Sequence, residues 1–184
     1  MKNRFPKSQS GFTLIELMVT LAVAAIVLAT AIPNFREMVK DNRIVTTSNE
    51  FLGMIHLARS EAIRGGKEVR LCKTSNLSNC VTTGGWEQGW IVVDTTDASV
   101  LRKRTGLDSN LTLRGNNNVQ NYLSFNSMGA MGGTNGQIIL CDDRARNDFG
   151  GHKSTARVVI ISTTGRPRLV KGDDSDVTVN SCSP

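Results

Sequence analysis

The chain has few residues of the kinds that carry out catalysis. Its 184 residues include two His, His56 and His152, and no HExxH, GxSxG or P-loop pattern. A lone His in a helical stretch or a Gly-rich loop is ordinarily a surface or packing residue. The Gly-rich stretch 129–133 lacks the Lys and the following helix that would hold a phosphate. The sequence therefore predicts a protein that is not an enzyme and uses no cofactor.

Metal-binding patterns are also missing. The four Cys include no CxxC pair, which argues against a Zn site. The acidic clusters Asp142-Asp143 and Asp173 to Asp176 lack the loop pattern of a Ca²⁺ site. We therefore expect no bound metal.

Charge is nearly absent from one long segment. Between Phe12 and Ile32 the only charged residue is Glu16, and there is no Gly or Pro. The segment matches the ~20 residues that an α-helix needs to cross a bilayer. Its Thr residues can bond back to the helix backbone, so they are compatible with a membrane span. Pro33 closes the apolar run.

The residues before this segment form a basic leader. They include Lys2, Arg4 and Lys7, contain no acid, and end in Gly11. A secretory signal peptide is cleaved after its apolar region, whereas here the small residue precedes that region, which would be kept. Removing the leader would expose the amine of Phe12. Such a charge pattern also keeps the N-terminus on the cytoplasmic side of the membrane.

Glu16 is unusual because a carboxylate inside a membrane segment is unfavourable by about 2.5–3.5 kcal/mol. One interpretation is that it lies near the interface, where it reaches water or stays protonated. The other is that it pairs with a cation on a neighbouring chain. The basic leader favours the second, because the new amine of Phe12 on an adjacent copy would supply that cation.

The stretch Gly11-Phe12-Thr13-Leu14-Ile15-Glu16-Leu17 resembles the class III signal of type IV prepilins and pseudopilins. This resemblance implies cleavage by a prepilin peptidase after Gly11 and N-methylation of Phe12. It also implies that the helix assembles into a filament core with other major and minor pilins. Glu16 would there contact a neighbour's N-terminus.

Beyond Pro33 the sequence predicts an amphipathic helix over residues 34–64. Apolar residues recur at helical spacing, and Gly65-Gly66 is a stop signal. The expected buried face comprises Phe35, Met38, Val39, Asn42, Val45, Leu52, Ile55, Ala58 and Ala62. A helix with such a face needs a partner surface from the rest of the chain.

Residues 65–184 are expected to form a β-rich globular domain. Short β-branched or alternating runs are separated by Asn, Asp, Gly and Ser clusters, which indicates antiparallel sheets. The runs are 69–72, 90–93, 100–104, 111–114, 122–125, 137–141, 157–161, 169–170 and 177–179. The fold class is therefore α+β, with a leader at 1–11, a membrane or filament-core helix at 12–33, and the long helix packed on the sheets.

Four Cys point to two disulfides. A membrane helix with a cytoplasmic N-terminus places the rest of the chain in the bacterial periplasm, which is oxidising. Four Cys allow three pairings. Cys72 and Cys80 flank a polar turn, so we predict a local bridge there, and Cys141 would then pair with Cys182.

The order of the later motifs resembles a narrower family. The strand Trp86-Glu87-Gln88-Gly89-Trp90 is similar to the double-Trp strand of the GspH/FimT-like minor pilins and pseudopilins. Phe125 with Gly129, the stretch 139–142 and the stretch 158–168 also resemble that family. The resemblance covers nearly the whole chain and implies the type IV pilin fold, closest to FimT- and FimU-type minor pilins.

One loop is a candidate ligand site. Gly165-Arg166-Pro167-Arg168 lies between two predicted strands, so it should form a hairpin tip or rim with two exposed Arg. Arg binds phosphate oxygens in a bidentate manner without reading base sequence. Lys171 would add charge, as would Lys153, Arg144 and Arg146 if the fold brought them close. The acidic run that begins at Asp173 lowers the local positive potential.

The Gly-Arg-x-Arg pattern resembles that of FimT-type minor pilins, which bind DNA in natural transformation. Net charge alone does not indicate DNA binding. Removing the three leader cations from the 22 Lys and Arg leaves 19 basic against 16 acidic side chains. The predicted function is a minor pilin in the inner membrane and the pilus, with a periplasmic domain that binds DNA without sequence preference. The alternatives are a structural minor pilin that initiates pilus assembly, or a GspH-type pseudopilin of type II secretion.

Overall fold

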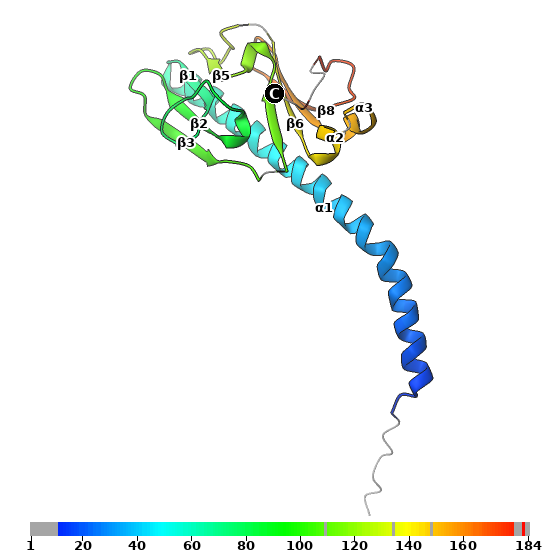
Figure 1. Cartoon of the computed structure of the whole chain (residues 1–184). Coiled ribbons are helices and arrows are strands. Elements are labelled where there is room, and N and C mark those ends of the chain that lie inside the picture. Colours follow the sequence, from blue (N-terminus) through cyan, green and yellow to red (C-terminus); the bar gives the residue numbers. More distant parts are fainter. Residues whose placement is uncertain (1–10, 109, 134, 148, 179–181, 183–184) are drawn as a thin grey trace, which may run out of the picture. The chain divides into compact units, whose positions relative to one another are not determined.

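The computed structural model describes residues 11–108, 110–133, 135–147, 149–178 and 182, and Figure 1 traces their course. The expected leader, apart from Gly11, lies outside the described residues. Two compact units divide the chain, one ending at Val39 and the other beginning at Lys40. Helix α1 (Leu14–Gly65) runs through both, and each unit is described by itself.

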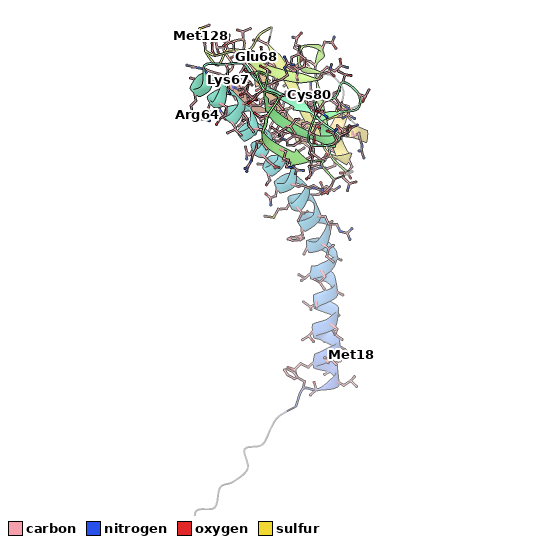
Figure 2. The ribbon with its side chains drawn as sticks, turned by 90° about the vertical axis from the view of Figure 1, so that its left-hand side faces the viewer. Met18, Arg64, Lys67, Glu68, Cys80 and Met128 are labelled. Carbon is pink, nitrogen blue, oxygen red and sulfur yellow. A yellow bond between two sulfur atoms is a disulfide. The ribbon has the colours of Figure 1, made fainter. Side chains whose placement is uncertain are left out.

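The first unit consists of the apolar half of α1. Thr13 caps the helix, because its hydroxyl oxygen accepts a hydrogen bond from the Glu16 N–H at 3.2 Å. Thr13 and Glu16 have the spacing of a capping box. Every residue from 11 to 39 is exposed, including Met18, whose side chain projects from the bare helix in Figure 2. This stretch is long and apolar enough to cross a membrane.

The Thr residues of this half behave as the sequence predicts. The hydroxyls of Thr20 and Thr30 donate to the carbonyls of Leu17 and Val27, at 2.9 and 3.0 Å. Their polar groups are therefore satisfied within the helix, which a lipid environment requires.

The second unit combines the remainder of α1 with two four-stranded antiparallel sheets. The first sheet has the order β3-β2-β1-β5 and the second β4-β6-β7-β8. The strands are β1 (Val69–Lys73), β2 (Gly89–Asp94), β3 (Val100–Thr105), β4 (Thr112–Gly115), β5 (Tyr122–Phe125), β6 (Gly136–Cys141), β7 (Arg157–Ile161) and β8 (Pro167–Lys171). Short helices are η1 (Trp86–Gln88), η2 (Asn117–Val119), α2 (Asp143–Asn147), α3 (Phe149–His152) and η3 (Lys153–Thr155).

The predicted strands are confirmed from the first to the eighth. Val177 and Thr178, expected in a ninth, are not in a strand, and residue 179 lies outside the described part of the chain. Helices α2 and α3 were not predicted, because they are too short to show helical periodicity.

The core of the second unit lies where α1 packs against both sheets. Phe51 is fully buried, with Trp86 and Trp90 packed edge-on at ring-centroid distances of 5.5 and 5.1 Å. The Trp86 indole N–H donates to the Val119 carbonyl at 3.2 Å. The double-Trp pattern thus supplies the largest side chains that meet the helix.

The buried face of α1 differs from its predicted extent. Phe35, Met38 and Val39 of the first unit and Asn42 of the second are exposed, so the prediction was wrong for these four. Burial begins at Ile44 and continues through Phe51, neither of which was assigned to the face. Periodicity detects an apolar face but not where along the helix its partner surface begins.

Helix α1 ends in a Schellman motif. Gly66 has φ +61°, Lys67 N–H donates to the Ala62 carbonyl at 3.2 Å, and Gly66 N–H donates to Ile63 at 3.4 Å. The Gly65-Gly66 stop is therefore confirmed. Lys67, which Figure 2 labels beside Glu68, pairs with the buried carboxylate of Asp94 at the end of β2. This hydrogen bond from Lys67 lowers the pKa of Asp94 below its usual value.

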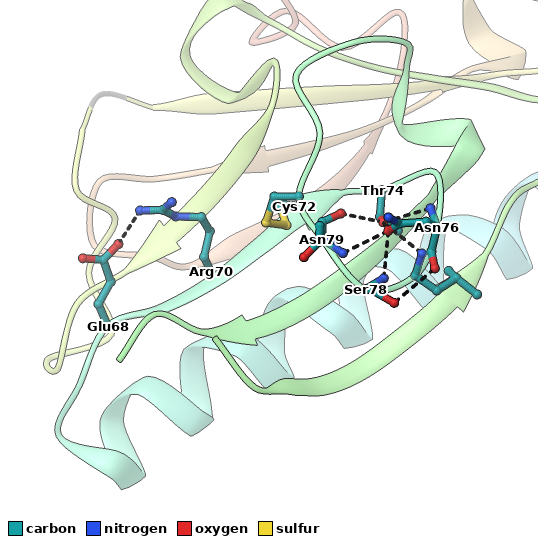
Figure 3. The surroundings of a disulfide bond; sticks show 9 residues. Glu68, Arg70, Cys72, Thr74, Asn76, Ser78 and Asn79 are labelled. Atoms are coloured by element: carbon teal, nitrogen blue, oxygen red, sulfur yellow. Dashed lines mark hydrogen bonds and ion pairs between the residues drawn. A yellow bond between two sulfur atoms is a disulfide. The ribbon is translucent and has the colours of Figure 1, made fainter. Parts of the chain in front are cut away.

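Both predicted disulfides are present. Cys72–Cys80 has a Cα–Cα distance of 5.5 Å and Cys141–Cys182 one of 5.9 Å, within the usual range. The first bridge closes the polar loop after β1, where the Thr74 hydroxyl donates to the Asn79 carbonyl at 2.7 Å (Figure 3). The second ties residue 182 to the end of β6. The α+β class predicted from the sequence is confirmed.

Candidate nucleic-acid interface

The Gly-Arg-Pro-Arg stretch lies at the β7–β8 hairpin, as predicted, with Gly165 and Arg166 in the turn and Pro167 and Arg168 at the start of β8. The turn is closed by hydrogen bonds from Ser162 N–H to the Arg166 carbonyl at 3.1 Å and from Gly165 N–H to the Ser162 carbonyl at 2.8 Å. The Ser162 hydroxyl also accepts from Arg166 N–H at 3.2 Å. The backbone on either side of Arg166 is therefore held by the turn.

Gly165 is required by both conformation and space. Its φ is +75°, which L side chains rarely adopt. A Cβ built there would lie 2.0 Å from the Gly129 carbonyl oxygen. The hairpin tip can therefore approach the loop around Gly129 only because residue 165 has no side chain.

Arg59 of helix α1 braces this contact. Its Nε donates to the Gly129 carbonyl at 2.9 Å, and its Nη2 to the Thr164 carbonyl at 3.4 Å. Met131 N–H adds a bond to the Thr163 carbonyl at 2.9 Å. The hairpin tip is thus joined to α1 as well as to the neighbouring loop. Sequence reasoning missed Arg59, because a single Arg on a helix does not reveal which carbonyls it meets.

The two candidate Arg side chains differ in their surroundings. Arg166 is exposed, and no ion pair to it is found among the described residues. Arg168 forms an ion pair with Asp176, in which both side chains are at least half exposed. Arg168 must therefore exchange Asp176 for any phosphate that it binds, whereas Arg166 need not.

Asp176 is held beside Arg168 by the outer face of the second sheet. Gln137 of β6 pairs with Ile160 of β7, which pairs with Arg168 of β8. The Gln137 amide donates to the Asp176 carbonyl at 2.7 Å and accepts from Thr178 N–H at 2.8 Å. The segment that contains Asp176 therefore lies across the row formed by Gln137, Ile160 and Arg168. The sequence showed that the acids were close, but not that one would pair with Arg168.

The other cations do not all gather at the hairpin tip. Lys171 lies on the opposite face of β8 from Arg168, since side chains alternate along a strand. Arg144 pairs with Asp41 and with Asp142. The candidate site therefore consists of Arg166 and Arg168 beside Gly165.

The processing residues lie in the other unit. Gly11 and Phe12 precede the helix and are exposed, and Glu16 lies in its first turn. An acid there is favoured by the partial positive charge at a helix N-terminus. Sequence reasoning missed the cap that Thr13 provides to the Glu16 N–H, although the Thr-x-x-Glu pattern was its signal.

Comparison with known protein families identifies two regions. Residues 47–165 match the family model of the type II transport protein GspH. Residues 6–32 match the prokaryotic N-terminal methylation motif. The chain belongs to the GspH family. It is a minor pilin or pseudopilin of the type IV pilus or type II secretion class, as the resemblance predicts.

A fimbrial protein from Pseudomonas aeruginosa is 36% identical over 63 residues, which are 34% of this GspH-family chain. The match spans 40% of the length of that fimbrial protein. Among solved structures, the type IV minor pilin FimU of P. aeruginosa aligns with a TM-score of 0.59 and 22% identity, covering 77% of this chain and 96% of that one.

The minor pseudopilin EpsH from the type II secretion system of Vibrio cholerae aligns with a TM-score of 0.50 and 15% identity, covering 71% and 98% of the two chains. These likenesses confirm the predicted type IV pilin fold. Arg166 and Arg168 lie just beyond the matched GspH range.

Proposed function

We propose that this chain is a minor pilin of the type IV pilus that holds DNA weakly and without sequence preference, in the service of natural transformation. The observation that carries the proposal is the hairpin tip. Gly165 and Arg59 hold its backbone in place, and Arg166 extends from it into solvent. A side chain on a fixed backbone loses less conformational freedom on binding phosphate than one on a mobile loop.

The rest of the proposed function concerns assembly. Prepilin peptidase cleaves after Gly11, Phe12 is N-methylated, and the apolar half of α1 enters the inner membrane with the globular unit in the periplasm. Glu16 then contacts the N-terminus of a neighbouring pilin in the filament. The protein acts as a structural subunit without catalytic activity. The methylation motif and the exposed apolar helix support these steps.

The alternative function is a structural initiator of pilus assembly or a GspH-type pseudopilin of type II secretion. The GspH family match and the Arg168–Asp176 ion pair favour it, because that pair already neutralises half of the proposed clamp. The neighbouring genes distinguish a pilus from a secretion system. Incorporation into purified pili tests the same point at the protein level.

The DNA proposal is tested on the full-length chain in a non-ionic detergent. Binding of duplex DNA should fall as salt rises, since each neutralised phosphate releases counterions. Changing Arg166 and Arg168 together to Gln should lower the affinity and reduce the slope of log affinity against log salt by about 0.9 for each phosphate that is no longer neutralised. In a transformable host, DNA uptake should fall while pili still form.

Two further variants sharpen this experiment. Asp176→Asn frees Arg168 from its ion pair and should raise the affinity of the parent. The double change Arg102→Gln and Lys103→Gln removes two exposed cations from β3, in the other sheet, and should alter DNA binding little. If the Arg166 and Arg168 double variant and the Arg102 and Lys103 double variant lose the same affinity, then DNA binding depends only on net charge. If the parent protein shows no salt-sensitive DNA binding, the DNA proposal fails and the structural alternative remains.

A further inference from the structure

A polar cavity of about 460 Å³ lies where the two sheets meet, away from the hairpin. Lys73, the last residue of β1, lines it together with Arg114 of β4 and the segment around η1. The polar side chains at its wall are those of Lys73, Glu87, Gln88, Arg114, Asn117 and Gln120. β4 and β8 are opposite edges of the second sheet, so this cavity and the hairpin tip are separate sites.

Lys73 is a buried cation without a carboxylate partner among the described residues. The residue is 2% exposed, and its Nζ donates to the Gly84 carbonyl at 2.6 Å. An ammonium has three N–H donors, so this neutral carbonyl accepts one of them. A buried charge is ordinarily paired, because transfer out of water is costly. Burial, followed by the proximity of Arg114, lowers the pKa of Lys73.

The nearby carboxylate does not neutralise the cavity. Glu87 forms an ion pair with Arg114, and it also accepts a hydrogen bond from Leu113 N–H at 3.4 Å. The Nε of Arg114 is buried and has no hydrogen-bond partner in the described part of the protein. Two cations therefore face one carboxylate. Gln88, Asn117 and Gln120, whose amides carry N–H donors, also line the wall.

We propose that this cavity binds a small oxyanion, a phosphate or a carboxylate group, through Lys73 and Arg114. An oxyanion accepts several hydrogen bonds at once and supplies the negative charge that Lys73 lacks. The wall is held in place for such a ligand. The Trp86 indole is fixed by its bond to Val119, and the backbone of Lys73 is paired within the first sheet.

The experiment uses the full-length, ¹⁵N-labelled chain in a non-ionic detergent, with ionic strength held constant by chloride. Inorganic phosphate is titrated in one arm and acetate in the other. The protein has two Trp, and only Trp86 lines this cavity. Its indole N–H signal should shift and saturate, while the backbone amide signals of β8, at the opposite edge of the second sheet, stay in place as an internal control.

Three variants test the assignment. Lys73→Gln should weaken binding at least tenfold, whereas Lys103→Gln, on exposed β3, should leave it unchanged. Asn117→Asp lies at an exposed position of η2 and should weaken binding by adding a negative charge without disturbing the core. The Asn117→Asp variant keeps the test valid if Lys73→Gln fails to fold. Such a failure would follow from losing the hydrogen bond between Lys73 and the Gly84 carbonyl.

Saturation by phosphate alone assigns a phosphate group, and saturation by acetate assigns a carboxylate. No saturable shift in either arm would overturn the proposal. So would binding that Asn117→Asp leaves as strong as in the parent. The outcome does not depend on DNA binding by Arg166 and Arg168, which stand on the opposite edge of the second sheet.

Discussion

The two halves of helix α1 are equally helical but differ in what satisfies their apolar side chains. Ile26 in the first half is 69% exposed, whereas Ile55 in the second half is fully buried. The second half packs against sheets that the same chain provides. The first half has no such surface among the described residues, so its stability in the cell depends on lipid or on other pilin subunits. An Ile in the second half is therefore covered by its own chain, whereas an Ile in the first half needs lipid or another subunit to cover it.

The largest expected effect tests this contrast with one substitution made in two places. Ile55→Ala should lower the free energy of unfolding of the globular unit by about 2–5 kcal/mol, since it opens a cavity in the core. Ile26→Ala should leave that free energy unchanged. Near-ultraviolet circular dichroism follows the transition, because Trp86 and Trp90 both lie in the globular unit. Equal destabilisation by the two variants would contradict the division.

Removing a disulfide should have the next largest effect on stability, and both disulfides lie in the globular unit. Cys141–Cys182 closes a loop with a sequence separation of 41 and Cys72–Cys80 one of 8. In the chain-entropy model the longer loop contributes roughly 3–4 kcal/mol and the shorter one less. Cys182→Ser should therefore lower the melting temperature more than Cys80→Ser. Thermal unfolding of the two variants measures this, and the reverse order would contradict the entropic explanation.

Glu16 should have the smallest effect on folding and a clear effect on assembly. Glu16→Ala removes a charge from the membrane segment, so insertion should be unimpaired or improved. Incorporation into filaments should fall, as measured by immunoblotting of sheared pili. Glu16→Gln is the matched control, because Gln keeps the size and hydrogen-bonding capacity of the side chain and removes only the charge.

If the carboxylate charge matters, the Gln variant should be as defective in assembly as the Ala variant. Normal assembly of Glu16→Ala would mean that Glu16 is a tolerated interfacial residue. Mass spectrometry of the parent from the same cells should show methylated Phe12 as its first residue. An intact Met1 would contradict the proposed processing.

Sequence patterns predicted the elements better than the contacts between them. The strands at 137–141 and 157–161 and the stop at Gly65-Gly66 were all readable, because propensity and turn chemistry are local properties. The disulfide partners were also predictable, since one pair flanks a short loop. These features depend on residues that are close in sequence, except Cys141–Cys182, which followed once the other two Cys were paired.

The candidate site was only partly predictable. Gly165 and the two Arg were identified from their order, and the turn was predicted from Gly165 and the flanking strand patterns. The bond from Arg59 to Gly129 joins residues 70 apart, and the link from Gln137 to Asp176 joins residues 39 apart. Such contacts depend on how the sheets pack against each other. Hydrophobic periodicity carries no information about that packing. For the same reason, nothing in the sequence brought Lys73 and Arg114 to one cavity.

The bridge between Cys141 and Cys182 also has a mechanical consequence. The covalent ring that it closes contains β7, β8 and the hairpin tip. A pull applied at Arg166 acts inside this ring, so the chain that it can draw out is limited to the residues between Cys141 and Cys182. The same tip is joined to α1 through Arg59. If the tip binds a polymer as proposed, tension on that polymer would pass into α1 through Arg59, and the bridge would limit how far the β7–β8 region can extend.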